Sequence, residues 1–413
     1  MKSEMTTSEI MALQEAFVMP TYAPKTALVR GEGCWVWDAE GKRYLDFCSG
    51  IAVTNIGHSH PRQVAAIREQ AEQLMHVSNL FMNPLQPQLA EALVRCSGLA
   101  GAKCFFCNSG AEANEGLIKL ARLWGSTRGR HEIITMRQSF HGRTLATLTA
   151  TGQDKVKHGF GPLPGGFVYA DYNELDSVRA LVNDQTAAIM VEALQGEGGV
   201  IPSAPDFLPG LRALCDEMGI LLLCDEVQAG VGRTGRWFGF QHYGVEPDAF
   251  SLAKGLGGGF PIGGIVAGPR LADTFQPGHH ATTFGGTPLG SAAALAVIET
   301  IESEDLLANA VAMGERFMQG LADIAAAHPA WIEGVRGRGL MNGLVLKVPA
   351  APLQQFLFEA GLLSIATAQR VLRMLPAMVV SAEEIDQALS WIDVACHALH
   401  DEMVALVMQV DEN

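Results

Sequence analysis

The chain is poor in positive charge and contains no long hydrophobic run. Its 413 residues include 29 Lys and Arg against 44 Asp and Glu, a net charge of −15 at pH 7. Nucleic acids and anionic membranes bind basic patches, so this balance argues against both as partners. No run reaches the roughly 18 apolar residues of a membrane-spanning helix. The N-terminal segment 1–7 is polar and lacks a secretory apolar core, so we expect a cytoplasmic protein.

Cysteine and histidine are too scattered to predict a metal centre. The eight cysteines lie in apolar contexts, as expected in a reducing compartment. Cys104 and Cys107 form a CxxC pair, but no second pair follows at zinc spacing, so buried strand thiols are the better interpretation. His58 and His60 precede Pro61 without evident carboxylate neighbours, which indicates a turn. We therefore expect no metal.

Short apolar runs alternate with helical patterns between about residues 100 and 270. The expected strands are Lys103–Cys107, Glu132–Met136, Ala188–Glu192, Ile220–Cys224, Ala249–Leu252 and Gly264–Ala267. The expected helices are Ala111–Arg122, Leu175–Val182 and Pro205–Met218. This alternation predicts an α/β fold whose mostly parallel sheet is covered by helices on both faces. Ligands of such sheets bind at the carboxyl ends of the strands.

The two ends of the chain are expected to build a second, smaller α+β domain. Strand-like pieces occur at Cys34–Asp38 and Arg43–Phe47, and helical patterns at Pro288–Ile301 and Leu306–His328. Alternating strands and helices return from about residue 335. The expected division is 1–65 (N-terminal part of the small domain), 66–287 (large domain), 288–330 (connecting helices) and 331–413 (C-terminal part of the small domain).

Lys254 and Asp225 are the strongest candidates for chemistry. Lys254 follows an expected strand and is itself followed by glycines, so a flat ligand could approach it closely. Asp225 ends the apolar run that begins at Ile220. Together they supply what pyridoxal phosphate (PLP) requires: an amine for a Schiff base and a carboxylate for the pyridine nitrogen. A lone lysine before glycine is more often a solvated loop cation, so the hypothesis depends on the neighbouring motifs.

Two further segments offer groups that suit such a cofactor. Ser109 can cap the helix that it precedes, and the N–H groups of Ser109, Gly110 and Ala111 would form an anion site suited to a phosphate. Phe140 could stack on a planar ring, and Arg143 could grip a carboxylate. Taken alone, the first segment favours an ordinary capped helix, and the second is equally compatible with a core aromatic and a surface charge.

Two glycine-rich segments need separate interpretations. Glu192 ends an expected strand, and Glu197 lies in the loop that follows. If a carboxylate of the substrate binds nearby, the negative charge of Glu197 needs a cationic partner. Arg373 is the candidate partner. The GxGxxG pattern of Gly230–Gly235 is discounted as a dinucleotide site, because it does not lie directly between a strand and a helix.

Six motifs, in their order and spacing, resemble the class III aminotransferases of the fold type I PLP enzymes. The motifs are Asn108–Asn114, Phe140–Arg143, Gln195–Gly199, Asp225–Gln228, Leu252–Gly255 and Thr282–Gly286. With Tyr44–Phe47 and Gly57–Pro61 before them and Val371–Pro376 after them, the resemblance covers nearly the whole chain. It implies a PLP-dependent homodimer with shared active sites.

The resemblance assigns roles by position. Lys254 would form the Schiff base, Asp225 would pair with the ring nitrogen and Gln228 with the phenolic oxygen. It implies that the other cofactor contacts are Ser109, Gly110, Ala111, Phe140, Glu192, Val227 and, from the neighbouring subunit, Thr283. It implies that the substrate contacts are Arg143, Glu197, Thr282 and Arg373. In this family a glutamate like Glu197 masks the arginine while the first substrate reacts.

The resemblance also implies the reaction. The terminal amine of N-acetylornithine would pass to 2-oxoglutarate by ping-pong chemistry, giving N-acetylglutamate semialdehyde and glutamate in arginine biosynthesis. Departures from the usual motifs at Ala193, Thr287, Met374 and Ala377 leave the donor open. Succinylornithine, ornithine and 4-aminobutyrate remain alternatives within the same chemistry. An aminomutase and a non-catalytic PLP-binding regulator are alternatives from other classes.

Overall fold

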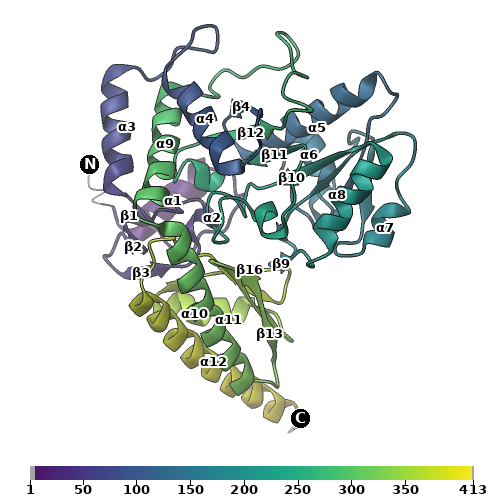
Figure 1. Ribbon diagram of the computed structural model, residues 1–413. Helices are drawn as coiled ribbons and strands as arrows, with labels where there is room; N and C mark the ends of the chain where they lie inside the picture. The colour runs from purple at the N-terminus through teal and green to yellow at the C-terminus, as the bar shows by residue number, and fades with distance from the viewer. Residues whose placement is uncertain (1–4, 412–413) are drawn as a thin grey trace.

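A seven-stranded sheet forms the centre of the computed structural model, which describes residues 5–411 and side chains as far as Leu399 (Figure 1). Its strand order is β4-β12-β11-β10-β7-β5-β6. The strands are β4 (Lys103–Cys107), β5 (Glu132–Met136), β6 (Phe167–Ala170), β7 (Thr186–Val191), β10 (Leu221–Asp225), β11 (Ala249–Leu252) and β12 (Gly263–Ala267). Only β12 runs antiparallel to its two neighbours. The predicted mostly parallel sheet is therefore confirmed.

Helices cover both faces of this sheet, because successive strand residues point to opposite sides. On β10, Leu221 and Leu223 pack in the same cluster as α5, whereas Leu222 and Cys224 pack in the cluster that includes α4 and α8. The helices of this region are α4 (Leu85–Ser97), α5 (Gly110–Ser126), α6 (Leu145–Ala150), α7 (Leu175–Arg179) and α8 (Phe207–Met218). All five residues of β10 are buried, which explains the apolar run Leu221–Cys224 that precedes Asp225.

A second set of elements joins the beginning and the end of the chain. One sheet has the order β1-β2-β3-β15, in which Leu362 and Leu363 pair with β3. Its strands are β1 (Leu28–Glu32), β2 (Trp35–Asp38), β3 (Arg43–Asp46) and β15 (Leu362–Leu363). The other sheet comprises β13 (Ile332–Arg338), β14 (Met341–Leu346), β17 (Val371–Met374) and β16 (Ile365–Thr367). The expected contact between the two chain ends is thus present.

The remaining helices include the long α9 and α10 and the C-terminal α12, of which α10 and α12 run side by side in the lower part of Figure 1. Their bounds are α1 (Thr7–Phe17), α2 (Ser49–Ala52), α3 (Pro61–Gln73), α9 (Pro288–Ser303), α10 (Leu306–Ala327), α11 (Ala351–Ala360) and α12 (Ala382–Asp411). A short ladder pairs β8 (Leu194–Gln195) with β9 (Ile201–Pro202). Within residues 5–411, no helix is both long and apolar enough to cross a membrane.

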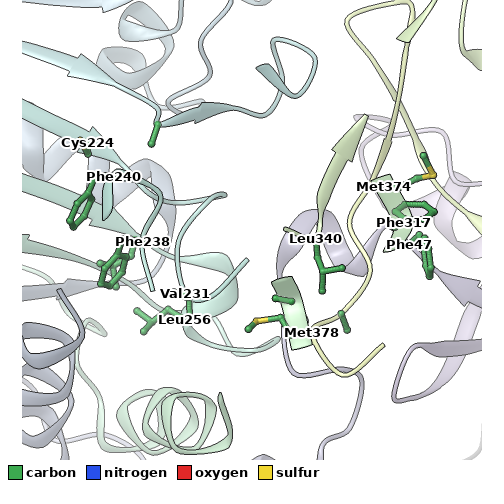
Figure 2. Close-up of a cluster of buried hydrophobic side chains, with 14 of the residues drawn as sticks. Phe47, Cys224, Val231, Phe238, Phe240, Leu256, Phe317, Leu340, Met374 and Met378 are labelled. Atoms are coloured by element: carbon green, nitrogen blue, oxygen red, sulfur yellow. The ribbon is translucent and has the colours of Figure 1, made fainter. Parts of the chain in front are cut away.

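A single hydrophobic cluster connects the central sheet with the C-terminal elements. In Figure 2, Cys224 and Phe240 lie on the side of the central sheet, and Phe317 and Met374 lie on the opposite side. Val231, Leu256, Leu340 and Met378 occupy the space between them. Because this cluster is continuous, loops that follow the central strands are held against the C-terminal segment.

Candidate active site

The carboxyl ends of the parallel strands and of β4 meet at one cavity of about 440 Å³. Lys254 comes two residues after β11, Asp225 ends β10 and Glu192 follows β7 directly. Predicted residues that line the cavity are Ser109, Gly110, Ala111, Phe140, Arg143, Glu192, Glu197, Asp225, Val227, Gln228 and Lys254. The sequence-based expectation of a ligand site at this edge therefore corresponds to a real cavity.

Lys254 sits in a strained backbone conformation inside a desolvated site. Its φ is 45°, a left-handed value that side chains other than glycine seldom adopt. Burial lowers the pKa of its amine, although the negative charge of Glu197 acts in the opposite direction. The lowered pKa increases the neutral fraction of the amine, which is the nucleophilic and basic form.

Asp225 is held ionised by three hydrogen bonds. Its Oδ2 accepts from Asn114 Nδ2 and lies 2.7 Å from His141 Nδ1, and its Oδ1 accepts from the Val227 N–H at 3.0 Å. Burial alone would raise the pKa of this carboxyl, but the bond and charge of His141 lower it. The pKa of His141 is raised: burial opposes its charge, and Asp225 outweighs that effect.

His141 and Asn114 were not predicted as site residues. His141 lies within the quoted motif Phe140–Arg143, and Asn114 lies within Asn108–Asn114, yet neither received a role. Each is distant from Asp225 in sequence, by 84 and 111 positions. The only available signal was their position in motifs that follow strand ends of the same sheet.

Glu192 is a second buried carboxyl in the cavity. It accepts hydrogen bonds from the backbone N–H groups of Phe140 at 3.2 Å and Gly196 at 3.3 Å. Burial raises its pKa to about 7, with His141 acting in the opposite direction and Asp225 in the same one. Glu192 can therefore hold a proton near neutral pH, unlike Asp225.

The start of α5 lies at the cavity and has the predicted cap. Ser109 Oγ accepts from the Glu112 N–H at 3.2 Å, which confirms the predicted cap. A glycine is needed at position 110, because a Cβ there would lie only 2.6 Å from Val227 Cγ1. Ser109, Gly110 and Ala111 line the cavity, and the N-terminus of a helix favours an anion.

Glu197 and Arg373 form the expected ion pair. Arg373 Nη1 donates to Glu197 Oε1 at 2.5 Å and to Gln228 Oε1 at 3.0 Å. Arg373 is 1% exposed and lies behind Glu197, outside the cavity lining. Burial opposes the charge of Glu197, but Arg373 lowers the pKa of Glu197 below its ordinary value.

Arg143 and Phe140 lie near each other at the cavity. The Arg143 guanidinium carbon is 5.6 Å from the centroid of the Phe140 ring. Among residues 5–399 no carboxylate forms an ion pair with Arg143, so its charge is available to a ligand in the cavity. Both residues follow β5, as their place after that strand predicted.

Thr282 and Thr283 do not join the other predicted residues. They line a separate cavity of about 350 Å³ beside Glu112 and Glu115 on the outer side of α5. Thr283 is exposed. Within one chain, the structure therefore leaves these two threonines outside the cavity that contains Lys254.

The discounted motifs have structural explanations. Residues Gly230–Gly235 form turns, the short 3-10 helix Gly239–Tyr243 begins only four residues later, and the motif does not line the cavity. The expectation that His58 and His60 lack carboxylate neighbours is wrong. His58 lies 2.7 Å from Asp46, and His60 lies 3.2 Å from Glu304, but each pair is separate.

Cys104 and Cys107 are free thiols on β4, as expected. Cys107 is buried and Cys104 is partly buried. Burial raises the pKa of both to about 12, so neither thiol is a ready thiolate for metal or redox chemistry.

Comparison with known proteins decides the family. Residues 18–396 match the family model described as Aminotransferase class-III. The chain belongs to the class III aminotransferases. It is therefore a PLP-dependent aminotransferase. Relatives named acetylornithine aminotransferase include one from Gloeobacter violaceus, 51% identical over 92% of this chain and 96% of its own. Another, from Caldanaerobacter subterraneus subsp. tengcongensis, is 46% identical over 93% and 98%.

Solved structures give the same fold. Ornithine aminotransferase from Toxoplasma gondii ME49 matches with a TM-score of 0.92 and 32% identity over 96% of both chains. Acetylornithine aminotransferase from Stenotrophomonas maltophilia K279a matches with a TM-score of 0.82 and 37% identity, over 95% of this chain and 100% of that one. The likeness covers at least 95% of this chain, which confirms the fold type I architecture.

The cavity fits PLP in size and in donor groups. It offers a desolvated amine, an ionised carboxylate and a helix N-terminus, the three groups that the aldehyde, ring nitrogen and phosphate of PLP require. Ser109, Gly110 and Ala111 stand at one end, and Lys254 and Asp225 come from neighbouring strands.

Proposed function

We propose that the chain transfers the terminal amine of N-acetylornithine to 2-oxoglutarate, giving N-acetylglutamate semialdehyde and glutamate. The observation that carries this proposal is the Glu197–Arg373 pair at the wall of the Lys254 cavity. An enzyme that alternates between an ω-amine and an α-keto diacid needs an arginine that is masked for one substrate and free for the other. Relatives about 50% identical are named for acetylornithine.

The residues have the following roles in this proposal. Ser109, Gly110 and Ala111 hold the phosphate, Phe140 stacks on the ring, and Gln228 bonds the phenolic oxygen, with Glu192 and Val227 beside them. Asp225, fixed by His141, holds a proton on the ring nitrogen. When bound, PLP supplies an aldehyde that takes up amines and a ring that accepts electrons. Lys254 Nζ takes the proton from the substrate carbon and delivers it during transfer.

Substrate recognition is assigned to two cationic groups. Arg143 binds a substrate carboxylate in the first half-reaction, while Glu197 keeps Arg373 masked. In the second half-reaction Glu197 moves aside and Arg373 binds the α-carboxylate of glutamate. Thr282 is assigned to the substrate site of the neighbouring subunit.

We propose further that two chains share their active sites. Thr283 would reach the phosphate bound by the neighbouring subunit, which agrees with its exposure and its distance from the cavity of its own chain. The large apolar side chains that are exposed in the single chain include those of Leu80, Phe81 and Met82, and that of Phe284 next to Thr283. Such a patch favours burial in a homodimer. The same proposal includes a cytoplasmic location and a place in arginine biosynthesis. It also includes the division of the chain into 1–65, 66–287, 288–330 and 331–413.

The proposal is tested by measuring products with the purified holoenzyme. N-Acetylornithine and 2-oxoglutarate should yield glutamate, with a higher kcat/KM than succinylornithine, ornithine or 4-aminobutyrate. Initial rates at several concentrations of both substrates should give the parallel lines of ping-pong kinetics. Rearrangement of an amine without a keto acid would favour an aminomutase, and PLP binding without turnover would favour a regulator.

A further inference from the structure

A cluster of potential metal ligands lies where the C-terminal end of α10 meets α12. His328 caps α10, and Asp393 and His397 are one turn apart on α12. One ligand atom from each residue lies within 4.8 Å of the other two. Among residues 5–399 this is the only group of three or more such side chains that converges in this way. It lies on elements that contribute nothing to the Lys254 cavity.

The distances suit a small divalent ion. His328 Nε2 is 3.5 Å from Asp393 Oδ1, and His397 Nε2 is 3.9 Å from the same oxygen. Ligands around tetrahedral Zn²⁺ at about 2.1 Å are separated by roughly 3.4 Å. A modest change of the His397 rotamer would bring all three atoms to that spacing. This side chain is 66% exposed and can make the adjustment.

His328 supplies a second, independent observation. Its side chain is 6% exposed, and its Nε2 is buried without a hydrogen-bond partner. That atom lies 3.5 Å from Asp393 Oδ1, which is too long for a good hydrogen bond. A buried imidazole nitrogen usually has a hydrogen-bond partner, so an orphan directed into a carboxylate–histidine pair is explained by an ion.

We propose that His328, Asp393 and His397 bind a divalent transition-metal ion of the Zn²⁺ type. Two imidazoles and one carboxylate favour such an ion over Mg²⁺ and Ca²⁺, which prefer oxygen ligands. Three protein ligands leave the fourth position to water. The bound ion joins the end of α10 to α12 and stabilises the packing of the C-terminal helix.

The test uses the PLP-loaded enzyme after treatment with EDTA. Equilibrium dialysis against ZnCl₂ measures the bound metal, and thermal unfolding with ZnCl₂ or MgCl₂ measures stabilisation. His397→Ala removes an exposed ligand and leaves the fold intact, and His158→Ala removes an exposed histidine outside the cluster as the matched control. Asp393→Asn provides a second ligand variant.

The wild-type enzyme and His158→Ala should bind one Zn²⁺ per chain, and Zn²⁺ but not Mg²⁺ should raise Tm by several degrees. His397→Ala and Asp393→Asn should bind at least about 100-fold more weakly and lose the rise in Tm. Equal zinc binding by His397→Ala and His158→Ala would overturn the proposal. So would a wild-type enzyme whose Tm does not respond to Zn²⁺.

Discussion

At the scale of single residues, the two buried carboxyls of the site differ in their hydrogen-bond partners and therefore in pKa. Asp225 has His141 and two N–H donors, and its pKa is lowered, whereas Glu192 has only backbone donors and burial raises its pKa to about 7. Two carboxyls in one cavity therefore differ in charge at neutral pH. This difference gives Asp225 the permanent negative charge that a protonated ring nitrogen needs.

Replacing His141 tests that reasoning through stability. Because the pKa of Asp225 is lowered on folding, its ionisation stabilises the fold above its ordinary pKa and this contribution is lost as pH falls through the lowered value. His141→Asn should remove about 3 kcal/mol at pH 7, and its stability should decline at a higher pH than that of the wild type. Urea unfolding between pH 4 and 7 measures both effects. Parallel pH profiles would contradict the assignment.

Replacing Glu197 tests the masking of Arg373. Glu197→Ala frees Arg373, so kcat/KM for glutamate should rise relative to that for the ω-amine by about tenfold, corresponding to roughly 1.4 kcal/mol. Single-turnover rates with each amine measure the ratio. Glu15→Ala, which changes an exposed glutamate on α1, serves as the control. An unchanged ratio in Glu197→Ala would count against the switch.

At the scale of elements, most central strands were predictable and one was not. The run Ile220–Cys224 is apolar throughout because β10 is buried on both faces, and this short continuous run predicted the strand. Strand β6 was missed because it is four residues long and mostly half-buried, which leaves a weak pattern. The ionic partner of Arg373 was predictable from the family motifs, whereas His141 and Asn114 depended on contacts that local sequence does not encode.

The N-terminus of α5 gives a prediction of its own. Gly110→Ala would place a Cβ only 2.6 Å from Val227 Cγ1, which is closer than non-bonded carbon atoms approach each other. The first turn must shift, and PLP affinity should fall by about tenfold or more as phosphate contacts lengthen. Dialysis followed by fluorescence titration with PLP measures the affinity. Gly165→Ala, whose Cβ would meet nothing within 4 Å, should bind PLP like the wild type.

At the scale of the whole molecule, Arg233 joins three distant parts of the chain. Its guanidinium donates to Asn55 Oδ1 at 2.6 Å, to the Leu340 carbonyl at 3.2 Å and to the Pro376 carbonyl. Burial lowers its pKa to about 10. The arginine lies in the motif that was discounted as a dinucleotide site. Its role is structural, since one of its bonds reaches Leu340, a member of the apolar cluster shown in Figure 2.

Removal of this guanidinium should be costly. Arg233→Met keeps much of the apolar volume but leaves buried acceptors without donors, so the free energy of unfolding should fall by about 3 kcal/mol. Chemical denaturation of the holoenzyme measures the change. Arg236→Met alters an exposed arginine nearby and should change stability by less than about 0.5 kcal/mol. Equal losses in the two variants would contradict this account of Arg233.

The domain boundaries and the shared active site remain predictions at this scale. A continuous apolar cluster shows that the two chain ends pack against the central sheet, but it does not divide the chain at particular residues. Thr283 could not be placed by one chain's fold, because its proposed ligand belongs to a second subunit. In a single chain, a contact between subunits is visible only as an exposed apolar patch.

The measurement that tests the central claim most directly is a half-reaction. The purified, yellow holoenzyme is mixed with N-acetylornithine in the absence of any keto acid, and its visible spectrum is recorded. The account predicts that the absorption band of the resting cofactor disappears, that the band of the aminated cofactor grows, and that 2-oxoglutarate restores the original spectrum. A spectrum that responds to glutamate and not to N-acetylornithine would contradict the proposed donor.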